Sequence, residues 1–165
     1  MRGKTHLAAG VAVGLLFAQH NTAAVTPYPV VDDAVITLAS AAMSLFPDLD
    51  IHTSKAGRKF PILSRLTQLL FGHRKMLHAP LFYLTIAYLL YLRWPQFSLF
   101  IFSAFLGAAS HLFLDALNPQ GVPLIWPDNK RFRLAHIRSG SVTDRVIGWL
   151  FLATDIFLFL QFFNF

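Results

Sequence analysis

The chain has no cysteine and no glutamate, and it has few charged residues of either sign. The absence of cysteine from its 165 residues excludes disulfides, zinc ribbons and thiol nucleophiles. Charged residues make up 13% of the chain, well below the roughly 25% of an ordinary soluble domain. Hydrophobic residues make up 55%, and the mean hydropathy is +0.53. The composition predicts an all-α membrane protein that forms one domain over residues 1–165.

Five apolar segments predict the helices of a small polytopic membrane bundle. We expect them at residues 5–18, 34–46, 79–92, 97–117 and 146–163. Only the last two approach the roughly 20 residues that cross a bilayer squarely. The three shorter segments could be thin spans, partly inserted helices or buried helices of a soluble bundle.

The basic residues indicate an orientation. If the N-terminus is cytoplasmic and each segment crosses once, all of the 14 Lys and Arg residues except Arg93 lie on the cytoplasmic side. The positive-inside rule therefore favours five crossings with this orientation. We interpret the net charge of +6 as a topology signal near anionic lipid, and we expect no nucleic-acid partner.

The first segment has two interpretations. Its short basic start and the small residues that follow the apolar run are typical of a cleaved signal peptide, and cleavage would remove His6. Gly10 and Gly14, however, form a small-xxx-small pair, which favours close packing against another helix.

Imidazole and carboxylate side chains lie at the expected cytoplasmic ends of the helices. The candidate metal ligands are His6, Asp48, Asp50, His73, His78, His111 and Asp115. His111 and Asp115 are four residues apart, so they project from one face of a helix. Such a nitrogen and oxygen ligand set suits zinc, with manganese or iron as alternatives, and it could hold more than one ion. Taken alone, His111 and Asp115 could also be a pair that neutralises itself.

Two further features concern the fourth and fifth segments. Ser103 and Gly107 precede His111 and Asp115 at intervals of four, so we expect this stripe to face the bundle interior. Asp155 lies about midway along the fifth segment, and we expect it to be separate from the metal site.

The stretch at residues 118–145 is expected to form a flap on the membrane surface or over the site. Its prolines and Gly121 prevent a continuous helix. Ser141 and Asp144 have the spacing of a capping box before the last helix. In the alternative interpretation Arg138 binds a phosphate and Asp144 joins the site.

The polar motifs together resemble a known family. They are Thr5-His6-Leu-Ala-Ala-Gly10, Pro47-Asp48-Leu-Asp50, His73-Arg74 with His78, His111-Leu-Phe-Leu-Asp115 and Gly121-Val-Pro-Leu-Ile-Trp-Pro127. This series is similar to that of the bacterial LexA-regulated, inner-membrane metal-dependent hydrolases. The resemblance implies a helical inner-membrane protein with a metal site built from these His and Asp residues. A looser similarity to the zinc-dependent phospholipase C and P1 nuclease group implies cleavage of phosphoesters.

The third motif departs from that family's pattern. Where the family has His-Arg-Gly-x-Thr-His-Ser, this chain has Lys75, Leu77 and Ala79 at the Gly, Thr and Ser positions. If those hydroxyl groups orient ligands, their loss would weaken metal binding or activity.

The sequence therefore predicts a metal-dependent hydrolase of the bacterial inner membrane with its site on the cytoplasmic side. A phosphoester, such as a phospholipid headgroup, is the expected substrate. Asp50 is the candidate general base, and Arg74 and Arg138 are candidates for holding an anionic group. Two alternatives stay open, namely a small transporter that uses a His and Asp relay and a non-catalytic protein stabilised by metal.

Overall fold

The computed structural model describes residues 1–21, 25–51, 54–71, 75–128 and 130–162. Its long helices are α1 (Gly3–His20), α2 (Pro29–Met43), α5 (Pro80–Arg93), α6 (Ser98–Ala116) and α7 (Val142–Phe162). Its shorter elements are the 3-10 helices η1 (Phe46–Asp50), η2 (Met76–His78) and η3 (Pro95–Phe97), the helices α3 (Lys55–Lys59) and α4 (Pro61–Phe71), and the strands β1 (Val122–Pro123) and β2 (Arg131–Phe132). The predicted all-α bundle is confirmed.

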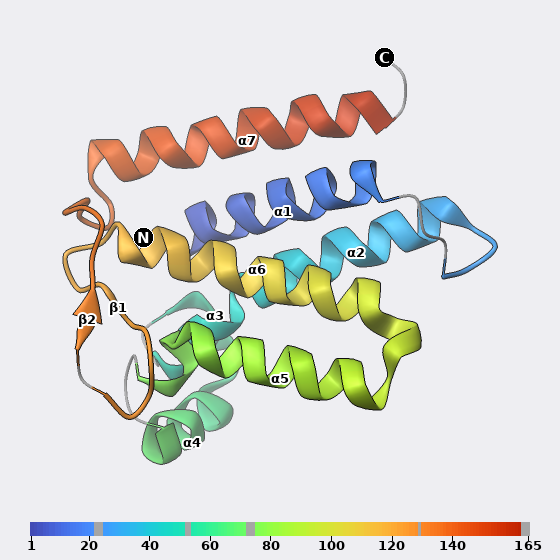
Figure 1. Ribbon diagram of the computed structural model, residues 1–165. Helices are drawn as coiled ribbons and strands as arrows, with labels where there is room; N and C mark the ends of the chain where they lie inside the picture. The colour runs from blue at the N-terminus through green and yellow to red at the C-terminus, as the bar shows by residue number, and fades with distance from the viewer. Residues whose placement is uncertain (22–24, 52–53, 72–74, 129, 163–165) are drawn as a thin grey trace.

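The five long helices run side by side and alternate in direction (Figure 1). Helix α2 packs against α1 and α6, α1 also packs against α7, and α5 packs against α6. The short helices α3 and α4 and the β1–β2 pair gather at one end of the bundle, on the left in Figure 1. At that same end α1, α5 and α7 begin and α2 and α6 finish.

Each of the five expected segments is a helix, but the second is longer than the sequence indicated. It begins at Pro29 and continues through η1, so three described segments are long and apolar enough to cross a membrane: Pro29–Asp50, Pro95–Ala116 and Val142–Phe162. Asp32 made the start of this segment look polar. Its carboxylate is buried and accepts hydrogen bonds from the backbone N–H groups of Val25 and Thr26 at 2.9 and 3.0 Å, so the helix can include it.

Small residues set the spacing between α1, α2 and α6. A Cβ atom at Gly14 would lie 2.8 Å from Cα of Thr37, and a Cβ atom at Gly107 would overlap the backbone of Ser40. The Ser40 hydroxyl donates to the Gly10 carbonyl at 2.7 Å. The close packing that Gly10 and Gly14 predicted is therefore confirmed, and α1 is an integral helix of the bundle.

The interior face of α6 is also as expected. Ser103, Gly107, His111 and Asp115 are all buried, and the Ser103 hydroxyl donates to the Ile36 carbonyl at 2.5 Å. The stripe thus lies against α2, with its small residues in the middle of the bundle and its ionisable residues at the end.

Two parts of the fold were not expected from the sequence. Helix α4 follows the second segment, and Val122 and Pro123 pair with Phe132 and Arg131 as a short antiparallel ladder. Both elements lie at the polar end of the bundle, where they surround the candidate site.

Candidate metal centre

Buried imidazoles and carboxylates from four segments meet at the polar end of the bundle. Helix α1 contributes His6, η1 contributes Asp48 and Asp50, η2 contributes His78, and α6 contributes His111 and Asp115. Apart from Asp48, whose side chain is 13% exposed, these side chains are almost completely inaccessible. We call these six residues the His/Asp cluster.

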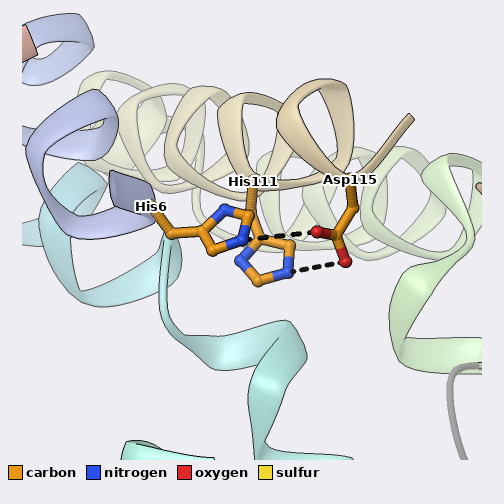
Figure 2. A group of neighbouring side chains, drawn as sticks. All are labelled: His6, His111 and Asp115. Atoms are coloured by element: carbon orange, nitrogen blue, oxygen red, sulfur yellow. Dashed lines mark ion pairs between the residues drawn. The ribbon is translucent and has the colours of Figure 1, made fainter. Parts of the chain in front are cut away.

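One group of ligand atoms in the cluster comes from His6, His111 and Asp115 (Figure 2). The rings of His6 and His111 are stacked, with their centroids 3.8 Å apart and their planes at 17°. Nε2 of His6 lies 3.3 Å from Oδ1 of Asp115, and Nε2 of His111 lies 3.7 Å from Oδ2 of the same carboxylate. Asp115 therefore presents a different oxygen to each imidazole.

A second group consists of Asp48, His78 and His111. Nε2 of His111 lies 3.9 Å from Oδ1 of Asp48, and Nε2 of His78 lies 3.6 Å from Oδ2 of Asp115. In each group the three ligand atoms lie within 4.8 Å of one another. Since both groups include His111, this residue is the centre of the cluster.

The orientation of His111 is fixed by a backbone contact. Its Nδ1 lies 2.7 Å from the Ser44 carbonyl oxygen, and a carbonyl can only accept a hydrogen bond. Nδ1 must therefore carry the proton, which leaves the lone pair of Nε2 for a metal. Among the described residues Nε2 has no hydrogen-bond partner, as is suitable for an atom that awaits a ligand.

His78 has a carboxylate beside each of its ring nitrogens. Its Nδ1 lies 3.3 Å from Oδ2 of Asp50, so Nε2 points toward Asp115. Burial lowers the pKa of the His78 imidazole below its ordinary value of 6.5, although Asp50 acts in the opposite direction. The ring is therefore neutral at pH 7, the state that binds a metal.

The amino group of Met1 contacts the cluster. It donates to Oδ1 of Asp115 at 2.8 Å, and both groups are fully buried. This contact was not expected from the sequence, and it places a positive charge on the carboxylate that faces His6. The Tyr83 hydroxyl, which donates to the Leu77 carbonyl beside His78 at 2.8 Å, is a second unexpected neighbour.

Four predicted site residues are not among the two groups of ligand atoms found in the described part of the chain. His73 and Arg74 lie outside the described residues. Asp50 contacts His78 and belongs to neither group of three ligand atoms. Arg138 is exposed, and within the described part of the chain no ion pair joins it to the cluster. The roles of these residues in metal or substrate binding stay predictions.

Asp144 joins α7 to the start of α1. Its Oδ1 accepts the Thr5 hydroxyl at 2.9 Å, and its Oδ2 accepts the backbone N–H of Gly140 at 2.6 Å and of Arg2 at 3.3 Å. The Ser141 hydroxyl accepts the Asp144 N–H at 3.2 Å, as in a capping box. These contacts agree with the interpretation of Asp144 as a helix-capping residue.

The stretch after α6 folds back on the end of the bundle. Leu134 and Ile137 donate backbone hydrogen bonds to the carbonyls of Ala116 and Leu117 at 2.8 and 2.9 Å. Val122 is buried against Tyr83 and the end of α6. In contrast, the tip at Leu124, Ile125 and Trp126 is exposed. The segment is thus a flap beside the cluster with an apolar outer tip.

Comparison with known proteins finds relatives over nearly the whole chain. The profile of the YdjM inner membrane protein family matches residues 1–163. YvsG of Bacillus subtilis strain 168 is 33% identical over 164 residues, which cover 98% of this chain and 97% of YvsG. The inner membrane protein YdjM of Escherichia coli K12 is 33% identical over 154 residues, which cover 89% of this chain and 77% of that protein. No solved structure matches the chain significantly.

Proposed function

The chain belongs to the YdjM inner membrane protein family. Starting from a protein of the membrane, we propose that it is a metal-dependent hydrolase. The proposal is carried by one observation, the two groups of three buried ligand atoms that share His111. Burying several ionisable side chains together is costly unless they are paired or bind a metal. A divalent cation would offset that cost here.

The residues present fit a divalent metal. His6, His78 and His111 would supply nitrogen, and Asp48 and Asp115 would supply oxygen, within the distances described above. This set suits zinc, with manganese or iron as alternatives. Because Asp115 offers one oxygen to His6 and the other to His78 and His111, the cluster could hold more than one ion.

When bound, such a metal would lower the pKa of a water molecule and polarise the bond to be cleaved. His111 and His78 are held for this task by the Ser44 carbonyl and by Asp50. Asp50 would orient His78 or accept a proton from the attacking water as general base. Asp48, which is the most exposed member of the cluster, marks the side from which substrate would approach. Arg74 and Arg138 would hold an anionic group of the substrate.

A phosphoester, such as the headgroup of an inner-leaflet phospholipid, is the proposed substrate. Helix α4 supports a lipid substrate, because its apolar side chains point outward: Ile62 is 83% exposed and Leu69 is 82% exposed. Its Thr67 hydroxyl faces inward and donates to the Leu49 carbonyl, between the two η1 aspartates, at 3.2 Å. Short amphipathic helices with an outward apolar face can lie in the membrane interface, and such a position of α4 would bring η1 close to lipid headgroups.

The test is a hydrolysis assay on purified, metal-loaded protein with soluble phosphodiesters and with phospholipid vesicles. We expect cleavage that is lost in Asp48→Ala and kept in the exposed loop variant Asp128→Ala. Replacing Ile62 and Leu69 by serine should reduce cleavage in vesicles without affecting a soluble substrate. Failure of the metal-loaded protein to cleave any phosphodiester or phospholipid would contradict the proposed activity.

A non-catalytic, metal-stabilised membrane protein is the second candidate. It is favoured by the burial of the cluster, since an enclosed site suits a structural metal whose ligands all come from the protein. Removal of the metal by a chelator distinguishes the two. Removal of a structural metal would leave an unfolded chain. Removal of a catalytic metal would leave the helices intact and abolish cleavage.

A further inference from the structure

A groove of about 560 Å³ runs between α1 and α7. Leu7, Ala8 and Val11 of α1 form one wall, and Gly148, Trp149 and Leu152 of α7 form the other. None of the His/Asp cluster residues lines it, so it is separate from the candidate metal centre. The side chain of Trp149 is 70% exposed, and tryptophan is enriched where a membrane meets water.

Basic residues gather where the groove begins. Arg2, Lys4 and Arg145 all line it, and all three are exposed. Nε of Arg2 lies 3.7 Å from Oδ2 of the buried Asp144, which offsets one positive charge. The mouth therefore keeps an excess of positive charge, while the walls beyond it are apolar.

We propose that this groove is a binding site for an anionic phospholipid. The phosphate would contact Lys4 and Arg145, with Arg2 beside them, and one acyl chain would lie along Leu7, Val11 and Leu152. Leu152 is seven residues after Arg145, or about 10 Å along the helix, so a chain attached to a headgroup at the mouth reaches the apolar wall. The groove thus matches an anionic lipid both in charge and in the order of its polar and apolar parts.

Asp155 lines the inner part of the groove. It lies ten residues after Arg145, or about 15 Å along the helix, too far to contact a phosphate at the mouth. Its carboxylate therefore faces the acyl-chain region, and it should not influence which headgroup binds. Asp155→Asn is accordingly a control for the charge at the mouth.

Trp149 lines the groove, so its fluorescence can report which lipid lies there. Replacing Trp94 and Trp126 by phenylalanine leaves Trp149 as the single tryptophan of the chain. The protein is placed in two nanodisc preparations of identical phosphatidylcholine and phosphatidylglycerol content. In one preparation the acyl chains of phosphatidylglycerol are brominated. In the other preparation the same number of phosphatidylcholine molecules carry the brominated chains instead. Bromine quenches the fluorescence of a tryptophan that it contacts.

We expect stronger quenching of Trp149 when bromine is on phosphatidylglycerol. Replacing Lys4 and Arg145 by glutamine should weaken the preference about fivefold for each charge removed. Asp155→Asn should keep the preference, and so should replacement of the exposed Arg58 and Lys59 of α3 by glutamine. If the two brominated lipids quench Trp149 equally in the protein whose basic residues are unchanged, that result alone overturns the proposal. A loss of preference in the Arg58 and Lys59 variant equal to that at the mouth would also overturn it, because surface charge in general would then be the cause.

Discussion

Nδ1 of His111 donates a hydrogen bond to the carbonyl oxygen of Ser44 at 2.7 Å, and this bond connects the helix packing to the candidate metal centre. Ser44 follows directly after α2, the helix held against α1 and α6 by close contacts at Gly10, Gly14 and Gly107. The position of α2 therefore determines the direction of the His111 ring. Its Nε2 is directed at Asp48 and Asp115 because the small residues let α2 approach this closely.

Asp50 should act on the metal through His78. Asp50→Asn is expected to weaken metal affinity about 10–100-fold, since carboxylates that orient a ligating histidine usually have effects of this size. Competition with a fluorescent chelator measures the affinity. Asp128→Asn, in the exposed loop after α6, is the matched control and should have no effect. An unchanged affinity in Asp50→Asn would show that Asp50 does not position His78.

Asp144 should matter for stability and not for metal content. Asp144→Ala leaves the Thr5 hydroxyl and the N–H groups of Gly140 and Arg2 without their acceptor. We expect a loss of about 1–3 kcal/mol in the free energy of unfolding, typical of buried donors left unsatisfied. Thermal unfolding in detergent and metal analysis of the same sample measure both quantities. Loss of metal from a folded variant would place Asp144 in the metal site instead.

Gly107 should tolerate no side chain. In Gly107→Ala the new Cβ would overlap the Ser40 backbone, and overpacking of this kind costs about 1–3 kcal/mol. Gly3→Ala is the control, because a Cβ at Gly3 meets nothing within 4 Å. A lower unfolding temperature for Gly107→Ala alone is the expected result. Equal stability of the two variants would mean that α2 and α6 are less tightly packed than described.

The orientation can be tested because the chain contains no cysteine. Lys130, in the flap, and Gln96, in η3, lie at opposite ends of the bundle. With the polar end in the cytoplasm, Gln96→Cys should react with a membrane-impermeant maleimide in intact spheroplasts. Lys130→Cys should react only after the membrane is permeabilised. The reverse pattern would place the His/Asp cluster on the outer side.

Periodicity and spacing predicted the long helices and the interior stripe of α6, because apolar runs and small residues at intervals of four record helix packing directly. The start of α2 was not predicted, because Asp32 is satisfied by local backbone N–H groups that hydropathy does not count. Helix α4 was missed for a related reason. Its polar Ser64 and Thr67 face the protein and its apolar residues face outward, the opposite of a soluble helix.

Residue types indicated which side chains gather at the cluster, but not which carboxylate contacts which imidazole. Asp48 and Asp50 were both candidate metal ligands on the sequence alone. In the 3-10 helix η1 they point in different directions, because side chains two residues apart in such a helix are about 120° apart around its axis. Asp48 therefore approaches His111 and Asp50 approaches His78. The contacts of Met1 and of the Ser44 carbonyl with the cluster depend on the fold and leave no pattern in the sequence.

The metal content of the purified protein tests the central claim most directly. We expect elemental analysis to find zinc, or manganese or iron, in the wild type and in His136→Ala, which changes an exposed loop histidine. The metal should be lost from His111→Ala, and from His6→Ala if the first variant fails to fold. A wild-type protein that neither contains a divalent metal nor binds one on addition would contradict the account, as would a folded His111→Ala protein with full metal content.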